Sequence, residues 1–501
     1  MATPSHRDDL FIRLTETMRS IKSAAGAVRQ VATSIVGGEV DQLARLYGHA
    51  IDYRGPDRNP VILIPGILGS KLEQRGTGRS IWGAFTGDYV DPRVPADARL
   101  ASHPMELGTP LSAMADDVVP VGVLDKFKFA LAGLPVATSA YVDIIRTLSA
   151  GGYSEESCGH IADNEDGSSS IDREPGLAND AFQFAWDWRR DLSESAVKLH
   201  DFIQRRRDHV RACRVKRGID DGGPIRFDLV AHSMGGMLAR YYLMYGPDRV
   251  PDDGPLPPPS WKGLEEIGRL VIVGTPSSGS VHSLEELVTG KNVSPTLPFY
   301  EPAVLGTMPG IYQLLPRPKL ARILDEKDQG VDLYDVEAWE RFGWSLLDEG
   351  QASVLESLLP DADASERRRI ARDHLAKILQ RVRRVHEALD QHVEMPRNSD
   401  GRRPSTHLIA GDLKETTCVL RVDSEGKLSS GGTSPGDGVV TRASALGDER
   451  IALPLEDRPL RLQSPVAWDS VTFLPADHMG LTRHPIFVDN LLHLLLEAPR
   501  G

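Results

Sequence analysis

Cysteine is scarce in this chain. The three cysteines, Cys158, Cys213 and Cys418, are odd in number and far apart. They predict neither a disulfide framework nor a zinc site, and they favour a reducing compartment.

A long apolar run is also missing. No stretch of about 18 uncharged apolar residues occurs, so we expect no membrane-spanning helix. The first residues, "MATPSHRDDLFIRL", carry acidic side chains where a secretory signal peptide carries its basic region. We therefore expect a cytoplasmic protein that is not secreted by a signal peptide and is at most peripheral to a membrane.

Positive charge is in deficit, because 58 Lys and Arg stand against 71 Asp and Glu, a net charge of −13. This balance argues against a nucleic-acid partner, since the phosphate backbone would repel the protein. One basic run, "RRRDHVRACRVKR" (205–217), holds seven Arg or Lys. It indicates either the solvated face of a helix or a docking surface for a membrane or partner, and we favour the solvated face.

Short apolar runs are what the sequence does contain, from residue 61 onward. They are continuous in Val, Ile and Leu rather than alternating, which is typical of strands buried on both faces of a parallel sheet. Helical stretches between them predict an α/β fold, with a mostly parallel central sheet and helices on both faces. The six runs are "VILIPG" (61–66), "FQFAWDW" (182–188), "FDLVAHS" (227–233), "RLVIVGTP" (269–276), "THLIAGD" (406–412) and "DSVTFLPADH" (469–478).

The chain of 501 residues is longer than a single compact domain usually is, so we expect one large core with insertions, or two domains. Residues 1–50 predict an N-terminal helical extension, which we expect to pack on the body rather than to anchor in a membrane. Its apolar residues at helical spacing are Phe11, Leu14, Met18 and Ile21.

Residues 51–501 are expected to form the main domain, with two insertions. The first, at about 70–180, is rich in Gly, Pro and Asp and predicts a lid. The second, at about 280–404, predicts a helical cap containing one long helix with Ser365 as its N-cap. The apolar stripe of that helix consists of Ile370, Leu375, Ile378, Leu379, Val382, Val385 and Leu389.

Ser233 is the candidate nucleophile. It follows a buried-type strand and precedes a helix-type run, so it sits where a sharp strand-to-helix turn would expose its hydroxyl. Such a turn requires small residues two positions before and after the serine, and here these are Ala231 and Gly235. The pentapeptide "AHSMG" is thus G-x-S-x-G with Ala in the first position. The alternative is a serine that only caps the following helix.

A serine nucleophile needs a base and an acid, expected downstream in the order Ser, Asp, His. Asp437 lies between glycines in "SPGDGVVTRAS" (434–444), and His478 follows the last apolar run. The residues alone leave competitors open. These are Asp412 and Asp477 among the acids, and His232, His282 and His484 among the histidines.

The developing oxyanion would need two backbone N–H groups. One is that of Met234, the residue after the nucleophile. The other is expected from Ile67, in the "PGILGS" turn (65–70) after the first apolar run.

Five segments together resemble the lecithin:cholesterol acyltransferase family. In chain order they are "VILIPGILGSKLE" (61–73), "WDWRRD" (186–191), "AHSMGG" (231–236), "GDGVVTRAS" (436–444) and "DHMGL" (477–481). The resemblance implies an α/β-hydrolase fold and a lipid ester substrate. It also implies Ser233 as nucleophile, Asp437 rather than Asp412 as acid, and His478 as base.

The resemblance assigns the oxyanion hole to the N–H groups of Ile67 and Met234. It gives the D-W-R segment 187–189 a structural role beside the site, and it places Trp82 where the family carries a lid aromatic that touches lipid. A core position for Trp82 is an equal alternative. Secreted and lysosomal members staple the lid with a disulfide, whereas residues 70–157 contain no Cys, so the lid must be held differently.

Acyl transfer through an acyl-serine, to water or to a second alcohol, is therefore the expected chemistry, with no cofactor or metal. A carboxylesterase for small soluble esters is the alternative within this class. The alternative outside it is a non-catalytic module that binds a membrane or a partner, against which the intact Ser, Asp and His argue.

Overall fold

The computed structural model describes residues 46–498, apart from 54, 86–87, 125, 132–133, 140, 154–179, 293–297 and 319–321. The expected helices of residues 1–45 and Cys158 lie outside the described residues. The described chain opens with helix α2 (Gly48–Asp52). Cys213 Sγ lies 3.6 Å from His209 Nε2, and Cys418 is a free thiol.

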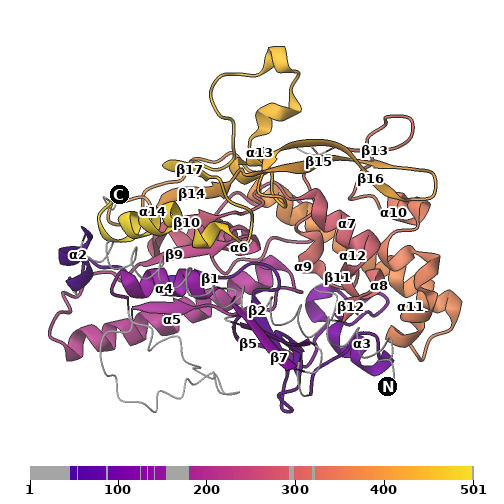
Figure 1. Ribbon diagram of the computed structural model, residues 1–501, viewed down its shortest axis with the longest axis horizontal. Coiled ribbons are helices and arrows are strands. Elements are labelled where there is room, and N and C mark those ends of the chain that lie inside the picture. The colour runs from indigo at the N-terminus through magenta and orange to yellow at the C-terminus, as the bar shows by residue number, and fades with distance from the viewer. Residues whose placement is uncertain are drawn as a thin grey trace, which may run out of the picture.

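A six-stranded parallel sheet forms the centre of the molecule, in the order β17-β14-β10-β9-β1-β8 (Figure 1). Each of the six apolar runs supplies one strand, which confirms the predicted α/β fold. The bounds are β1 (Val61–Ile64), β8 (Ala181–Gln183), β9 (Phe227–His232), β10 (Ile267–Val273), β14 (Ser405–Gly411) and β17 (Ser470–Leu474).

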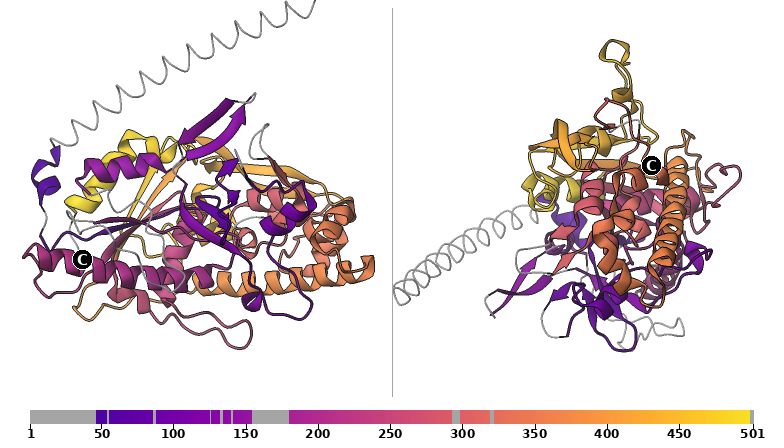
Figure 2. Two further views of the ribbon diagram at one scale, coloured as in Figure 1. Left: turned by 90° about the horizontal axis from the view of Figure 1, so that it is seen from below. Right: turned by 90° about the vertical axis from the view of Figure 1, so that its right-hand side faces the viewer.

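Helices cover both faces of this sheet, and alternate residues of each strand face opposite layers. Ile62 and Ile64 of β1 pack with the layer of α5 (Leu192–Lys216), α6 (Met234–Tyr245) and α12 (Ala364–Leu389). Val61 and Leu63 pack with α4 (Val142–Ala150) and α14 (Pro485–Leu496) on the other face. These two helices lie side by side (Figure 2, left). Both faces being covered explains why the strands read as continuous apolar runs.

Two small β-sheets and two α-helices, α3 and α4, occupy the described part of the interval where we expected a lid. One sheet contains β2 (Ser70–Gln74), β3 (Ser80–Trp82) and β5 (Val118–Val123), and the other contains β4 (Ala84–Phe85), β6 (Lys126–Leu131) and β7 (Leu134–Ser139). Helix α3 (Pro95–Ala101) lies between β4 and β5 in the chain.

The described part of the second insertion contains five short α-helices before the long one. They are α7 (Val281–Thr289), α8 (Pro302–Leu305), α9 (Pro309–Tyr312), α10 (Val336–Phe342) and α11 (Ala352–Leu358), followed by the long α12. The short strands β11 (Lys291–Asn292), β12 (Phe299–Tyr300) and β13 (Arg322–Leu324) lie among them.

A hairpin that the sequence analysis did not predict connects β14 to the Asp437 segment. It consists of β15 (Lys414–Val422) and β16 (Leu428–Gly436), followed by helix α13 (Arg442–Leu446). The sequence of β16, "LSSGGTSPG", is poor in the β-branched and aromatic residues that mark a strand. Most of its residues are exposed, so no buried side favours apolar side chains that would have marked it.

Helix α12 buries the whole predicted apolar stripe, but its N-cap is Asp363 rather than Ser365. The Asp363 carboxylate accepts a hydrogen bond from the Glu366 N–H at 2.9 Å. Ser365 lies one residue inside the helix, because the helix begins at Ala364.

The basic run 205–217 lies on α5 and is not purely a solvated face. The Arg206 guanidinium is buried and lies 4.7 Å from the centroid of the Phe202 ring. The buried Arg214 donates a hydrogen bond to the Arg58 carbonyl at 3.0 Å. In the part of the chain that the structure describes, no helix combines the length and the apolar character needed to cross a membrane.

The cap of α12 can be tested by substitution. Asp363→Ala should lower the free energy of unfolding by about 1 kcal/mol, because the N–H of Glu366 loses its acceptor. Ser365→Ala is the matched control and should change it by only a few tenths of that amount, about 0.3 kcal/mol. Urea unfolding followed by circular dichroism measures both, and a larger loss in Ser365→Ala would restore Ser365 as the cap.

Candidate active site

Ser233 lies at the junction of β9 and α6, with φ 52° and ψ −128°. A residue with a side chain rarely adopts a positive φ, so neighbouring groups must hold this turn in place. Ser233 occupies the N-cap position of α6, yet its hydroxyl makes no capping hydrogen bond. The helix-cap alternative for this serine is therefore wrong.

Small residues make the turn sterically possible. A Cβ on Gly235 would lie 2.5 Å from the Pro65 carbonyl oxygen, and one on Gly236 would lie 2.0 Å from Thr275 Oγ1. Thr275 in turn donates its hydroxyl to the Ser233 carbonyl at 2.7 Å. Ala231 lies within β9 and is fully buried in the apolar core, where its methyl group is accommodated.

Asp437, His478 and Ser233 form a continuous hydrogen-bonded row, although they lie far apart in the chain. His478 Nδ1 lies 2.8 Å from Asp437 Oδ2, and His478 Nε2 lies 3.1 Å from Ser233 Oγ. With the ring proton on Nδ1, the carboxylate accepts a hydrogen bond from Nδ1–H, and Nε2 is free to accept the serine proton.

Asp437 is fixed from two sides. Its Oδ1 accepts hydrogen bonds from the N–H groups of Val439 at 2.9 Å and Val440 at 2.7 Å. Its carbonyl oxygen accepts one from the His478 N–H at 3.0 Å. The Asp437 side chain is 1 % exposed and that of His478 is 12 % exposed. A nearly buried carboxylate with three hydrogen bonds is a fixed acceptor for the imidazole.

The competing acids have other partners. Asp412 forms an ion pair with Arg442 at 2.7 Å. Asp477 accepts the Gly480 N–H at 2.7 Å and pairs with Lys414 at 3.3 Å. Neither carboxylate has a hydrogen bond to His478 among the described residues.

Two of the competing histidines also have separate roles. His484 is the N-cap of α14 and accepts the Ile486 N–H at 3.2 Å. His282 lies 3.2 Å from Glu286, and its hydrogen bonds to Glu285 and then Glu286 raise its pKa to about 9. In the described part of the chain, no group of three or more His, Cys, Asp and Glu side chains is arranged to hold a metal ion.

The third histidine, His232, has a different partner from Ser233. Its Nδ1 lies 3.2 Å from the hydroxyl of Tyr141, and burial lowers the pKa of the ring to about 3. The ring centroids of His232 and His478 are 5.1 Å apart. No motif in the sequence marked Tyr141, which precedes α4, and it is the structure that identifies it as part of the site.

The 65–70 turn touches the nucleophile. A Cβ on Gly66 would lie 2.6 Å from the Cβ of Ser233. The N–H groups of Ile67 and Met234, expected to form the oxyanion hole, make no hydrogen bond to any described residue. Both donors are thus available to a substrate oxygen.

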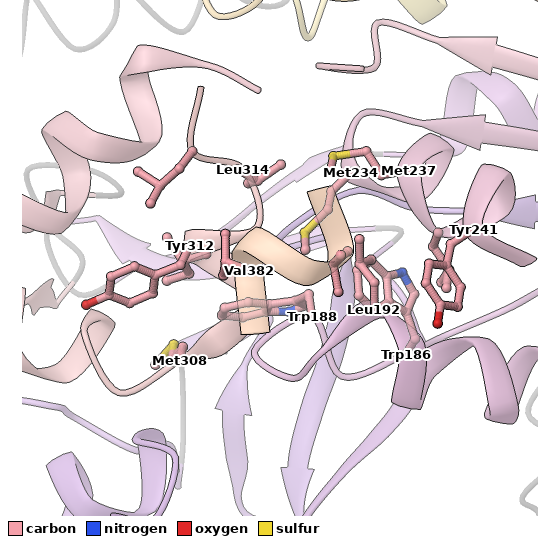
Figure 3. Close-up of a cluster of buried hydrophobic side chains, with 14 of the residues drawn as sticks. Trp186, Trp188, Leu192, Met234, Met237, Tyr241, Met308, Tyr312, Leu314 and Val382 are labelled. Atoms are coloured by element: carbon pink, nitrogen blue, oxygen red, sulfur yellow. The ribbon is translucent and has the colours of Figure 1, made fainter. Parts of the chain in front are cut away.

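The first turn of α6, directly after the nucleophile, packs in an apolar cluster. Met234 and Met237 of α6 lie in it together with Trp186 and Trp188, which follow β8 (Figure 3). Trp82 belongs to the same core and is only 2 % exposed, so in this structure it is a core residue and not a lipid-facing one.

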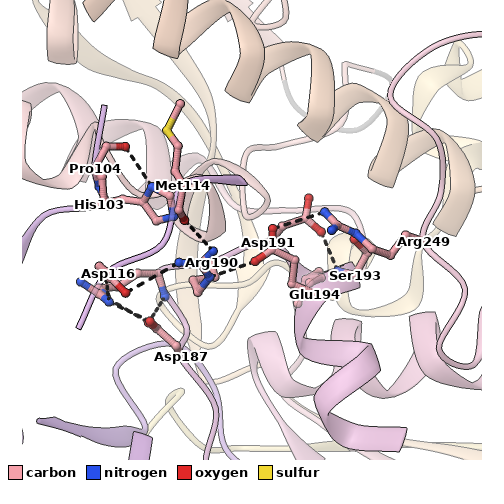
Figure 4. Close-up of polar contacts among 12 residues, drawn as sticks. His103, Pro104, Met114, Asp116, Asp187, Arg190, Asp191, Ser193, Glu194 and Arg249 are labelled. Carbon is pink, nitrogen blue, oxygen red and sulfur yellow. Dashed lines mark hydrogen bonds and ion pairs between the residues drawn. The ribbon is translucent and has the colours of Figure 1, made fainter. Parts of the chain in front are cut away.

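The D-W-R segment, in the loop after β8, forms buried ion pairs. Arg189 is buried and contacts Asp187 at 2.8 Å and Asp116 at 2.7 Å. The two carboxylates are labelled in Figure 4. Burial opposes ionisation of Asp187, yet the Arg189 guanidinium holds the pKa of that carboxyl below its usual range. Arg189 also donates to the Ala101 carbonyl at 3.1 Å, which ties α3 to the end of β8.

Comparison with known proteins supports the family resemblance. The model of the lecithin:cholesterol acyltransferase family matches residues 174–328, which include Ser233 and the D-W-R segment. This confirms the resemblance over that range. None of the curated proteins matches the chain significantly.

Two solved structures are similar at low identity. One is from the crystal structure of the Tle4–Tli4 complex, with 16 % identity and a TM-score of 0.50, and the match covers 87 % of this chain and 98 % of that one. The other is lipase 1 from Pelosinus fermentans, with 13 % identity and a TM-score of 0.23, over 56 % of this chain and 74 % of that one. The first likeness supports the fold described above.

The contact between Gly66 and Ser233 leads to a prediction. Gly66→Ala should slow the labelling of Ser233 by a fluorophosphonate probe by about tenfold or more, because the added methyl group displaces the nucleophile. Gly122→Ala is the matched control, since a Cβ there meets nothing within 4 Å. Labelling of Gly66→Ala at the wild-type rate would show that the turn does not fix Ser233.

Proposed function

From the resemblance to the lecithin:cholesterol acyltransferase family over residues 174–328, we propose a serine-dependent lipid acylhydrolase or O-acyltransferase. The observation that carries this proposal is the hydrogen-bonded row from Asp437 through His478 to Ser233. It gives the serine hydroxyl a base at 3.1 Å and gives that base a buried carboxylate. The substrate would be an ester lipid, a phospholipid or an acylglycerol.

The reaction would proceed through an acyl-serine. His478 Nε2 takes the Ser233 proton as Oγ attacks the ester carbonyl, and Asp437 stabilises the imidazolium that forms. The resulting tetrahedral oxyanion binds the N–H groups of Ile67 and Met234. His478 then gives its proton to the departing alcohol, and the acyl group remains on Ser233. The same base activates the incoming water or alcohol in the second half.

Both proposed oxyanion donors are main-chain N–H groups of residues that lie close to the nucleophile. Met234 is the first residue of α6, so its N–H belongs to the positive end of the helix dipole. Ile67 follows Gly66, which contacts Ser233 directly. Removing one such donor typically lowers the rate by roughly two to three orders of magnitude.

Two other functions compete with this one. A carboxylesterase would use the same three side chains on small soluble esters, and the family resemblance favours the lipid. A non-catalytic binding module has no need for a base within hydrogen-bonding distance of a strained serine. The geometry of Ser233 and His478 therefore favours an enzyme.

Substitution of the nucleophile tests the reaction type. Ser233→Ala should lower the turnover of ester substrates by roughly four to six orders of magnitude and abolish fluorophosphonate labelling. Ser283→Ala, which removes another buried hydroxyl from α7, is the control and should retain both. Labelling that survives in Ser233→Ala would show that a different residue is the nucleophile.

A second measurement tests the substrate class. The rate of hydrolysis of p-nitrophenyl esters should rise with the length of the acyl chain. The wild type, but not Ser233→Ala, should release fatty acid from phospholipid vesicles. Lipid analysis with an added long-chain alcohol distinguishes free fatty acid from a new ester, and thus hydrolysis from transfer. Highest rates on the shortest ester, with intact vesicles, would instead identify a soluble-ester carboxylesterase.

A further inference from the structure

The turn that carries the Ile67 N–H holds a strained conformation. Leu68, next to Ile67, has φ 61°, in the left-handed region that residues with side chains seldom occupy. The turn contains two glycines, Gly66 and Gly69, neither of which has a positive φ, so the strain falls on a leucine. Such a conformation persists only where surrounding groups hold it.

Four aromatic side chains supply the contacts that hold this turn. Trp186 Nε1 donates to the Pro65 carbonyl at 3.0 Å, and Trp82 Nε1 donates to the Leu68 carbonyl at 2.7 Å. A longer bond of 3.4 Å runs from the Trp188 indole to the Ser70 carbonyl. The fourth side chain is Tyr141, whose hydroxyl oxygen accepts the Gly66 N–H at 2.9 Å.

These bonds fix the main chain on both sides of Ile67. The Gly66 N–H and the Leu68 carbonyl are each held by a buried ring, and a hydrogen bond of 3.0 Å from the Gly69 N–H to the Gly66 carbonyl closes the turn. The Ile67 N–H itself has no acceptor among the described residues. The four rings therefore orient this peptide without using the donor that a substrate oxyanion would need.

Tyr141 also reaches the other half of the site. Because its oxygen accepts the Gly66 N–H, its own proton is directed to His232 Nδ1, 3.2 Å away. Burial raises the pKa of Tyr141 to about 12 and lowers that of His232 to about 3, so the hydroxyl keeps its proton and the ring is a neutral acceptor. His232 precedes the nucleophile, and its ring packs against His478.

We propose that Tyr141, with Trp82 and Trp186, acts as a set of positioning residues for the oxyanion hole, and that the Tyr141 hydroxyl joins the oxyanion turn to the His232–His478 ring pair. This inference rests on the proposed function. It assigns to Trp82 a role other than contact with lipid, since its indole N–H is directed to the turn and its ring is in the core.

The alternative is that these rings only contribute to the stability of the core. Loss of a positioning contact should act on the transition state, where the oxyanion forms, and leave ground-state binding nearly unchanged. Loss of core packing should instead lower the melting temperature. The two roles therefore differ in kcat, KM and melting temperature.

Tyr141→Phe is the most conservative test, because it removes one oxygen and keeps the ring. We expect kcat on an ester substrate to fall by about tenfold with KM within about twofold of the wild type. Tyr245→Phe is the matched control. It removes a buried tyrosine's hydroxyl at the far end of α6, which lies 3.4 Å from the Ala388 carbonyl, and kcat should not change.

Trp82→Phe gives an independent measurement. It removes the indole N–H from the Leu68 carbonyl, and kcat should again fall by about tenfold with little change in KM. Trp344→Phe is its control, because that buried indole donates to the Gly426 carbonyl at 2.6 Å and not to the oxyanion turn. Both tryptophan variants lose core volume, so any shared change in melting temperature reports packing and the difference in kcat reports positioning.

The outcomes separate this inference from the proposed function. An active wild type that is inactivated by Ser233→Ala supports the function, and the ratio of Tyr141→Phe to wild type tests the positioning role. Unchanged kcat in Tyr141→Phe would overturn the positioning role and leave the function standing. So would a fall in kcat that is matched in Tyr245→Phe, or one explained by a lower melting temperature.

Discussion

The positive φ of Ser233 is the constraint on which the rest of the site depends. That conformation directs the hydroxyl away from α6 and toward His478 Nε2, and it brings the turn so close to β1 that Gly235 has no space for a Cβ. The same crowding requires glycine at position 66, where the neighbouring turn meets Ser233. The closely packed main chain around Ser233 thus holds its strained conformation. The two N–H groups proposed for the oxyanion hole are part of the same main-chain segments.

The parallel sheet solves the remaining problem, which is to bring Asp437 and His478 to a serine more than two hundred residues earlier. All six strands end at one edge, so the loops after β14 and β17 return to the loop after β9. Main-chain contacts set the final positions. A Cβ on Gly411, at the end of β14, would lie 2.8 Å from the Cβ of Asp437, and the His478 N–H bonds the Asp437 carbonyl.

Much of this arrangement could be predicted from the sequence, because burial and turn geometry leave local signals. The six strands were visible as apolar runs, and the spacing of Ala231, Ser233 and Gly235 indicated the nucleophile turn. The β15–β16 hairpin was missed because its exposed Ser and Gly residues carry no apolar pattern. The cap of α12 was misplaced by two residues because Asp363 and Ser365 are both good capping residues. The expected cellular compartment stays a prediction.

Tyr141 and Trp82 mark the limit of sequence reasoning in a different way. Each acts through one polar atom on a main-chain group, Tyr141 on Gly66 and Trp82 on Leu68. Such a contact demands no spacing, no periodicity and no neighbouring motif, since the partner is a peptide group that every residue possesses. Residues that touch the reacting atoms must match one another chemically, and so they appear as motifs. Residues that hold the peptide of an oxyanion donor need only lie at the right place in the fold, so only the structure can identify them.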